Sequence, residues 1–408
     1  MRRTIAALSS AAVMLAFVAF TGPSASANHN GALEVQVGAP IAGVNGAASM
    51  RFLGASRITV HQGDSITFDL GGAHTATSLP ANTGADDWLD ANFRGLDKPF
   101  YYVNQDPDEA AGIVKDNFAA IDDPTDPTCG GTGEPACAYN GNEVVNSGSI
   151  FSQDTAEERF DFTIDVDANA GDFFWVVCLA HPHMRMKVTV VANNAAATTQ
   201  EAIDTAAASQ LAQDTDWAEA THAKYKAKRT SHVAANGVRY RDAWAGVDSH
   251  TASIAQFYPR KLVLKKGQRV RWRFDGLVYE DHTVSMPIPA IFGINFGTAE
   301  CDTNGDAPDG DVEPIPPATP EDEPTCPPGA VLEFDFDPAD FLSGVGDGVL
   351  RGRNDMEHSG IRGANIVTEG PLHGNSSYDV RFAARSGDRP FQYLCFLHDR
   401  MGGKIVVK

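Results

Sequence analysis

An internal repeat that covers most of the chain places the strongest constraint on its fold. A seven-residue pattern near position 180 returns near position 400, and both copies run directly into a segment rich in β-branched residues, 187–191 and 404–407. The shared pattern is Cys-x-x-His-x-x-Met, formed by Cys178, His181 and Met184 and again by Cys395, His398 and Met401. Two copies in the same order indicate one structural unit that is built twice.

The two halves also match upstream of this pattern. Residues 57–68 and 261–272 each alternate apolar and polar side chains on both sides of a glycine, Gly63 or Gly267. Alternation with period two around a turn glycine predicts two short β-strands. The phrases Asn146-Ser-Gly148 and His358-Ser-Gly360 fall at comparable places. Each half is therefore predicted to be an all-β unit of many short strands, a Greek-key sandwich or barrel.

The chemistry of the repeated pattern points to a soft metal ion. A thiolate, an imidazole and a thioether within seven residues suit copper, with the methionine as a weak axial ligand. A second histidine is needed in each half. His74 and His282 each follow the strand–glycine–strand segment of their half, in Ala73-His74-Thr and Asp281-His282-Thr.

On these residues each half resembles the cupredoxins, the small blue-copper proteins. The spacing is most similar to that of amicyanin, in which the axial Met follows the His by three residues. The resemblance covers most of both halves, but neither the segment between them nor the centres of the long insertions between His and Cys. It implies two tandem cupredoxin domains with type-1 copper sites and one-electron transfer. The implied ligands are His74, Cys178, His181 and Met184 in the first site, and His282, Cys395, His398 and Met401 in the second.

The first half departs from the repeat in its ligand loop. Met186 lies five residues after His181, which is the spacing of plastocyanin and pseudoazurin. Met184 is preferred as the axial ligand because it aligns with Met401, whereas Met186 aligns with a glycine of the second half. His183 has no counterpart and is interpreted as capping a surface turn, with exposure close to the copper as the alternative.

Chains with two cupredoxin domains also include copper nitrite reductases and small multicopper oxidases. Those enzymes need a second copper centre, which appears in sequence as His-x-His pairs and as a His beside the copper Cys. Here Val177 and Leu179 flank one Cys, and Leu394 and Phe396 flank the other. The remaining histidines occur singly and are expected to be exposed or structural, at positions 29, 61, 222, 232, 250, 358 and 373. The sequence thus favours an electron carrier over an enzyme, with copper storage or delivery as another alternative.

The N-terminus has the features of an export signal. Two arginines precede a short apolar run, and Ala25-Ser-Ala27 is a small-residue cleavage site, so residues 1–27 are predicted to be removed. The apolar run is too short for a membrane span, and a secreted or otherwise extracytoplasmic protein is expected. Its net charge is −21, or −23 without Arg2 and Arg3. Such a surface disfavours nucleic acid and anionic lipid, and a redox protein with a basic surface is the predicted partner.

The expected organisation is a cupredoxin domain at 28–192, a helical linker at 193–235 and a second cupredoxin domain at 236–408. The linker carries a capping box from Thr198 to Glu201, and a flexible Ala-rich linker is the alternative. The predicted disulfides lie within the acidic insertions, Cys129 with Cys137 and Cys301 with Cys326. A third disulfide between Cys178 and Cys395 is the competing role for the two remaining cysteines.

One further motif lies in the second insertion. From Asp302 to Glu313, acidic residues or Asn occupy positions 1, 3, 5 and 12 of an EF-hand-like calcium loop. Ala307 stands where that loop needs a glycine, and Pro308 follows. A solvated acidic loop is favoured over a calcium site.

Overall fold

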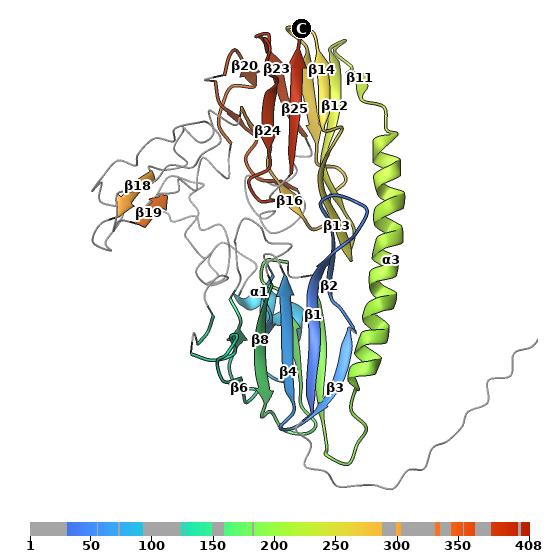
Figure 1. Cartoon of the computed structure of the whole chain (residues 1–408), viewed down its shortest axis with the longest axis vertical. Coiled ribbons are helices and arrows are strands. Elements are labelled where there is room, and N and C mark those ends of the chain that lie inside the picture. The colour runs from blue at the N-terminus through green and yellow to red at the C-terminus, as the bar shows by residue number, and fades with distance from the viewer. Residues whose placement is uncertain are drawn as a thin grey trace, which may run out of the picture.

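The fold is that of a computed structural model of the whole chain (Figure 1). The described residues are 31–92 except 55, 72 and 73; 124–148 except 127; 159–287 except 182; 299–302; 331–334; 344–363 except 354; and 377–408 except 399 and 400. The export signal, the pairing of Cys301 with Cys326 and the calcium-like loop therefore lie outside the residues that can be described. No helix in the described ranges is long and apolar enough to cross a membrane.

The first half forms two sheets that enclose one core. The first sheet has the order β2-β1-β4-β8-β6 and the second has the order β3-β10-β9-β5-β7. The strands are β1 (Ala32–Pro40), β2 (Ala47–Phe52), β3 (Arg57–His61), β4 (Ser65–Gly71), β5 (Thr77–Ser78), β6 (Cys137–Tyr139), β7 (Val145–Asn146), β8 (Arg159–Val166), β9 (Phe173–Val177) and β10 (Arg185–Val191). A short helix, α1 (Ala85–Asn92), follows β5.

The second half repeats this plan strand for strand. Its sheets have the orders β13-β12-β15-β23-β20 and β14-β25-β24-β17-β21. The strands are β12 (Arg239–Asp248), β13 (Ala252–Tyr258), β14 (Lys261–Leu264), β15 (Arg269–Arg273), β17 (Ser285–Met286), β20 (Val349–Leu350), β21 (Glu357–His358), β23 (Ser377–Phe382), β24 (Phe391–Leu394) and β25 (Gly402–Val407). Five short strands lie beside this plan: β11 (Ser231–Val233), β16 (Asp281–His282), β18 (Ala299–Asp302), β19 (Val331–Phe334) and β22 (Arg362–Gly363), the last paired with β16.

The predicted alternation produces these sandwiches. In β4 the side chains of Ile66, Phe68 and Leu70 are fully buried, while the polar residues between them are partly exposed. The same period-two pattern places Val270 and Trp272 of β15 in the second core. Strands that present one apolar face each must pack face to face to bury it. The predicted all-β class is confirmed, and the described residues contain only two helices.

The two sandwiches are joined through their first sheets. Strands β2 and β13 pair antiparallel, so that one sheet of 11 strands runs through both halves. The pairs are Ala252 with Ser49, Ser253 with Ala48 and Ile254 with Ala47. Pro40 pairs with Ala48 in one half and Asp248 with Ser253 in the other, so Ala48 and Ser253 are equivalent residues. Because equivalent residues face each other, the junction has the self-complementary register of a two-fold axis.

The hydrogen bonds beside the junction follow the same symmetry. The Met50 amide donates to the carbonyl oxygen of Thr251 at 2.8 Å, and the equivalent Ala255 amide donates to Gly46 at 2.7 Å. The continuous sheet thus contains strands from both predicted domains, 28–192 and 236–408. The boundaries of these domains stay a prediction.

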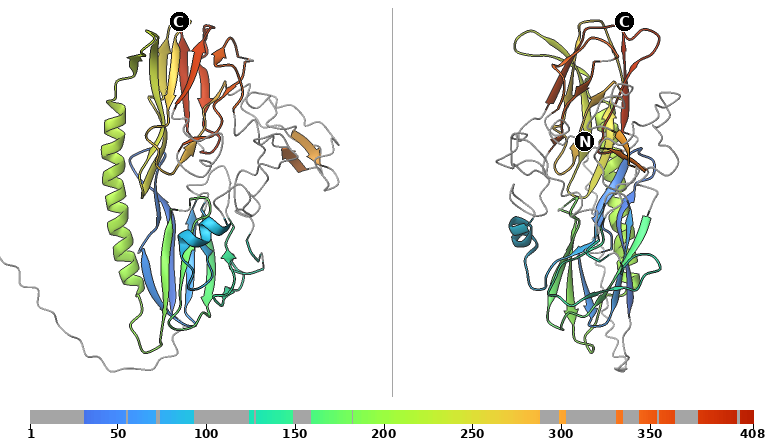
Figure 2. Two further views of the ribbon diagram at one scale, coloured as in Figure 1. Left: turned by 180° about the vertical axis from the view of Figure 1, so that it is seen from behind. Right: turned by 90° about the vertical axis from the view of Figure 1, so that its left-hand side faces the viewer.

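A single long helix, α3 (Gln200–Lys226), connects the halves and lies along both of them (Figures 1 and 2). The helical linker is thus present, but Thr198 is not its cap. Thr199 accepts from the Ala202 amide, while the Thr198 hydroxyl accepts from the Thr59 amide of β3. Tyr225 packs into a third apolar cluster with residues of the junction, among them Ile254.

A buried carboxylate attaches the helix to both halves. Asp214 of α3 is 1% exposed. It accepts hydrogen bonds from Ser49 at 2.7 Å, from Arg51 at 2.9 and 3.0 Å, and from Thr251 at 2.9 Å. Since Thr251 belongs to the second half, one side chain fixes the helix at the place where the two halves meet.

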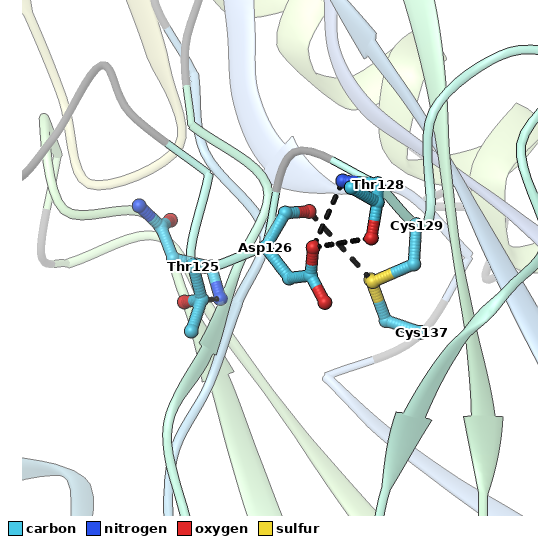
Figure 3. Close-up of a disulfide and its surroundings, with 6 residues drawn as sticks. Thr125, Asp126, Thr128, Cys129 and Cys137 are labelled. Carbon is cyan, nitrogen blue, oxygen red and sulfur yellow. Dashed lines mark hydrogen bonds between the residues drawn. A yellow bond between two sulfur atoms is a disulfide. The ribbon is translucent and has the colours of Figure 1, made fainter.

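The predicted bridge between Cys129 and Cys137 is confirmed (Figure 3). It joins the first residue of β6 to Cys129, which directly follows a turn in which Asp126 accepts from the Thr128 amide at 2.9 Å. Cys178 and Cys395 are both free thiols, so the alternative of a disulfide between them is wrong.

Candidate metal centres

The first group of candidate ligands gathers around Cys178, which directly follows β9. Its Sγ lies 3.7 Å from Nδ1 of His74, after β4, and 3.6 Å from Nδ1 of His181, in the loop between β9 and β10. The two Nδ1 atoms are 3.1 Å apart. Cys178 is fully buried, His74 is buried and His181 is half-buried. The structure therefore brings together the three residues that the sequence places 104 and 3 positions apart.

The second group repeats this arrangement around Cys395. Its Sγ lies 3.6 Å from Nδ1 of His282 and 3.6 Å from Nδ1 of His398. Among the described residues, these two are the groups of three or more His, Cys, Asp or Glu side chains whose ligand atoms lie close enough to share one ion.

The spacing of the donor atoms fits a bound metal. An ion bonded to sulfur at about 2.3 Å and to nitrogen at about 2.0 Å holds these two atoms roughly 3.5–3.7 Å apart at tetrahedral to trigonal angles. The four sulfur–nitrogen distances are 3.6–3.7 Å. The donors thus already stand at the separations that coordination requires, and one thiolate with two imidazoles is a donor set for copper or zinc.

Backbone and hydroxyl groups fix each cysteine in the same way. The residue after each upstream His is a threonine whose amide donates to the cysteine sulfur, Thr75 at 3.3 Å and Thr283 at 3.2 Å. Each threonine hydroxyl also accepts from the amide that follows the cysteine, at 2.8 Å in both halves. The sulfur is therefore held before any metal binds, and the amide contact favours the thiolate.

The Ser-Gly phrases now have a structural explanation. Ser147 Oγ accepts from the Ala76 amide at 2.9 Å, and Ser359 Oγ accepts from the Val284 amide at 2.8 Å. Each serine therefore ties its strand to the segment that carries the upstream histidine. The phrases mark a supporting contact of the site rather than a turn alone.

Two glycines leave room for the upstream histidines. Gly38 and Gly246 occupy the same bulge in β1 and β12, with φ of +64° and +73°. A Cβ atom at Gly38 would lie 2.4 Å from Nε2 of His74, and one at Gly246 would lie 2.0 Å from Nε2 of His282. Only glycine permits both the left-handed backbone and the buried ring.

The methionines close the ligand loops in matching ways. The Met184 amide donates to the His181 carbonyl at 2.8 Å, and the Cys178 amide donates to the Met184 carbonyl at 3.0 Å. Met401 makes the same two contacts with His398 and Cys395, at 3.3 and 2.9 Å. Met186 instead lies within β10, paired with Val176. Met184 is thus the structural equivalent of Met401, as the sequence alignment indicates.

The electrostatics favour a thiolate beside a charged imidazole. Burial opposes ionisation of Cys178, but hydrogen bonds from His181 and His74 outweigh it and lower its pKa to about 5. Burial likewise disfavours the charge on His181, yet the Glu280 carboxylate and the Cys178 thiolate raise its pKa to about 10. At neutral pH the metal-free site therefore holds a thiolate–imidazolium pair.

The second site has the same electrostatic pattern. The pKa of Cys395 is held well below its usual value by His282 and His398, against the effect of burial. The pKa of His398 is raised to about 10, because the Cys395 thiolate and Glu280 outweigh its burial. Glu280 is itself buried, and the positive charges of His181 and His398 nevertheless hold its pKa well below the ordinary range.

The interpretation of His183 as the cap of a surface turn is wrong. Its ring stacks on Tyr279 of the second half, with centroids 4.0 Å apart and planes 13° apart. The Tyr279 hydroxyl in turn lies 2.6 Å from Nδ1 of His250. His183 therefore belongs to the contact between the halves. Of the other single histidines, His61 and His358 are buried and hydrogen-bonded, while His29 and His373 lie outside the described residues.

Several supporting residues were absent from the sequence interpretation. The threonines after the upstream histidines and the two bulge glycines recur in both halves, and this recurrence is the signal that could have identified them. Glu280 gives no such signal, because Gly72 stands at the equivalent position beside Ala73-His74.

No protein-family model matches the chain, and no curated protein matches it in sequence. Among solved structures it is similar to a Cu-containing nitrite reductase from Thermus scotoductus SA-01, with 10% identity over 93% of this chain and 68% of that chain and a TM-score of 0.18. The multicopper oxidase mgLAC is 12% identical over 92% and 86% of the two chains, with a TM-score of 0.15. Lac15 from a marine microbial metagenome is 13% identical over 85% and 70%, also with a TM-score of 0.15. TM-scores this low carry no weight for the function.

Proposed function

We propose that the chain is an exported electron-transfer protein with two type-1 copper sites of the cupredoxin kind. The observation that carries the proposal is the duplicated donor geometry, in which a buried cysteine sulfur stands 3.6–3.7 Å from two imidazole nitrogens in each half. Copper held by one thiolate, two imidazoles and a distant thioether supplies one-electron redox chemistry.

The residues of each site have separate tasks. The cysteine and the two histidines provide the trigonal donors, and Met184 and Met401 are the proposed axial ligands. Thr75 and Thr283 hold the sulfur through their amides. Because most of these groups stand in loops anchored on neighbouring strands, little would have to move when an electron arrives or leaves, and a small rearrangement favours rapid electron transfer. A complete donor set also leaves no open position for a substrate, which favours an electron carrier over an enzyme.

The proposal extends to location and partner. The leader sequence and the disulfide between Cys129 and Cys137 support a place outside the cytoplasm. The net charge of −21 supports a redox partner with a basic surface.

The test is reconstitution of the chain without its leader with Cu(II). Two coppers per chain, an intense visible thiolate-to-copper absorption and reversible reduction are expected. Replacing Cys178 or Cys395 singly by alanine should remove one copper each and leave the other site coloured. Met184→Leu and Met186→Leu distinguish the axial candidates, because only loss of the true ligand should raise the reduction potential of the first site.

Each competing function predicts a different result. Copper that binds without colour and without reversible reduction would favour storage or delivery. Turnover of nitrite or dioxygen by the copper-loaded chain would instead establish an enzyme. One copper per chain would leave one of the two halves without the proposed role.

A further inference from the structure

Glu280 lies between the two candidate metal centres. Its Oε1 is 3.6 Å from Nε2 of His181 in the first site, and its Oε2 is 3.3 Å from Nε2 of His398 in the second. The glutamate is only 3% exposed. One carboxylate from the second half therefore faces one ligand histidine of each site, with one oxygen for each.

The backbone around Glu280 is held by hydrogen bonds to the side chain of Asp248. Asp248, at the end of β12, accepts hydrogen bonds from the amides of Val278, Tyr279 and Glu280, the last two at 2.7 and 2.6 Å. Tyr279 stacks against His183 of the first ligand loop. The segment that carries the carboxylate is thus attached both to its own sheet and to the opposite site.

The orientation of the two histidine rings shows which atoms donate to Glu280. In both His181 and His398 the Nδ1 atom faces the cysteine sulfur, so Nε2 carries the proton that points to Glu280. A carboxylate that accepts from the outer nitrogen of a ligand histidine fixes the ring and its tautomer. Oε1 is buried and makes no hydrogen bond within the described part of the chain. A small movement of His181 toward it would complete that bond.

We propose that Glu280 is a positioning residue shared by both sites, and that it couples them so that filling one site weakens metal binding at the other. A divalent ion at the first site would replace one proton of His181 and so raise the net charge of that site by one, which would draw the carboxylate toward it. The support for His398 is then weakened, and the same reasoning holds in reverse. The expected coupling is about tenfold in affinity, within the usual range for linked sites, and it must be reciprocal. This inference rests on the proposed function only in requiring that both sites bind a metal.

The experiment is a titration of the metal-free full chain with Co(II), which reports thiolate coordination by its absorption and needs no redox chemistry. Cys395→Ala and Cys178→Ala give the affinity of each site alone. In the unaltered chain the product of the two stepwise binding constants should be about tenfold lower than the product of these single-site constants. Glu280→Ala should abolish that difference and weaken both sites.

Glu280→Gln provides a sharper variant of nearly the same shape. Glutamine has one acceptor oxygen, whereas both histidines present donors, so only one site can keep its support. The two sites should therefore respond unequally, which a merely structural role would not produce. The matched control is Glu357→Gln, because Glu357 is an equally buried glutamate of the same half that bonds Tyr378 and the Gly348 and Val349 amides instead.

The outcomes separate the two proposals. A product of the stepwise constants that equals the product of the single-site constants, or coupling that persists in Glu280→Ala, would overturn the shared role of Glu280 and leave the copper sites intact. Equal effects of Glu280→Gln and Glu357→Gln would do the same. Failure of both Co(II) and Cu(II) to bind would instead refute the proposed function itself. If Glu280→Ala does not fold, the isosteric glutamine variant decides the question.

Discussion

The bulge glycine of the second half offers the most discriminating test of how the sites are built. Gly246→Ala would place a Cβ atom 2.0 Å from Nε2 and 2.4 Å from Cδ2 of His282. A buried carbon needs roughly 3 Å or more to the nearest non-bonded atom, so the His282 ring must move away by about 1 Å. His282 is 1% exposed and closely surrounded. Since metal–ligand distances tolerate only about 0.2 Å, the second site should lose its metal while the first keeps it.

The stability effect has two parts that a control separates. Alanine at a left-handed φ costs about 1–2 kcal/mol, and overpacking a buried ring costs about 1–3 kcal/mol more. Gly237 also has a left-handed φ, +80°, but a Cβ atom added there would meet no other atom within 4 Å. Gly237→Ala should therefore show only the first part. The difference in the free energy of unfolding between the two variants, about 1–3 kcal/mol, measures the clash with His282.

The assay combines denaturant unfolding of the metal-free variants with metal stoichiometry and absorption of the loaded ones. Gly246→Ala should bind one metal per chain and Gly237→Ala should bind two. Gly38→Ala should give the mirror result, with only the second site filled, because its Cβ would lie 2.4 Å from His74 Nε2. The reasoning is refuted if Gly246→Ala binds two metals with unchanged spectra, or if it is no less stable than Gly237→Ala.

Three further outcomes are expected. Because the pKa of Cys178 is about 5 and that of His181 about 10, a metal that binds between pH 5 and pH 10 must displace one proton from the His181 imidazolium. Its affinity at the first site should rise about tenfold per pH unit from pH 5 to 10, and more steeply below 5 where the thiol must also ionise; a flat profile in Co(II) titrations would contradict this. Asp214→Ala should lower the free energy of unfolding by about 3 kcal/mol, whereas exposed Asp216→Ala should change it by less than about 0.5 kcal/mol; equal effects would show that the buried carboxylate does not attach the helix. Replacing both cysteines of the confirmed disulfide by alanine should cost about 2–3 kcal/mol, given their separation of 8 residues, and unchanged denaturant midpoints would count against it.

The sequence could reveal the β architecture and the ligand groups because both depend on local, repeated chemistry. Period-two burial follows from the pleat of a strand, and Cys178 and His181 lie on one short loop. The upstream histidine was accessible only because it recurs, as His74 and His282, at the same place in two halves. A single copy would have left its partner among twelve histidines with little to distinguish it.

What the sequence could not reveal lies where the two halves meet. The junction strand at Ala47–Ser49 carries no motif, and small residues there are equally compatible with an exposed edge. The helix cap was misplaced by one position because two adjacent threonines compete, and the contact of Thr198 with Thr59 decides between them. Glu280 was overlooked for a related reason, since an unrepeated acidic residue in an acidic chain is inconspicuous until both sites surround it.

The two-fold register of β2 and β13 has a consequence for how such a site can arise. In a dimer of two identical subunits joined in this way, every side chain near the two-fold axis would be present in two copies. A glutamate there would face its own copy across a short, buried gap. Two such carboxylates would repel each other. A single covalent chain escapes this constraint, because one half can carry Glu280 while the other carries Gly72. Fusion of the halves therefore permits an odd number of charges between two matched metal centres, which no symmetric dimer of one sequence can achieve.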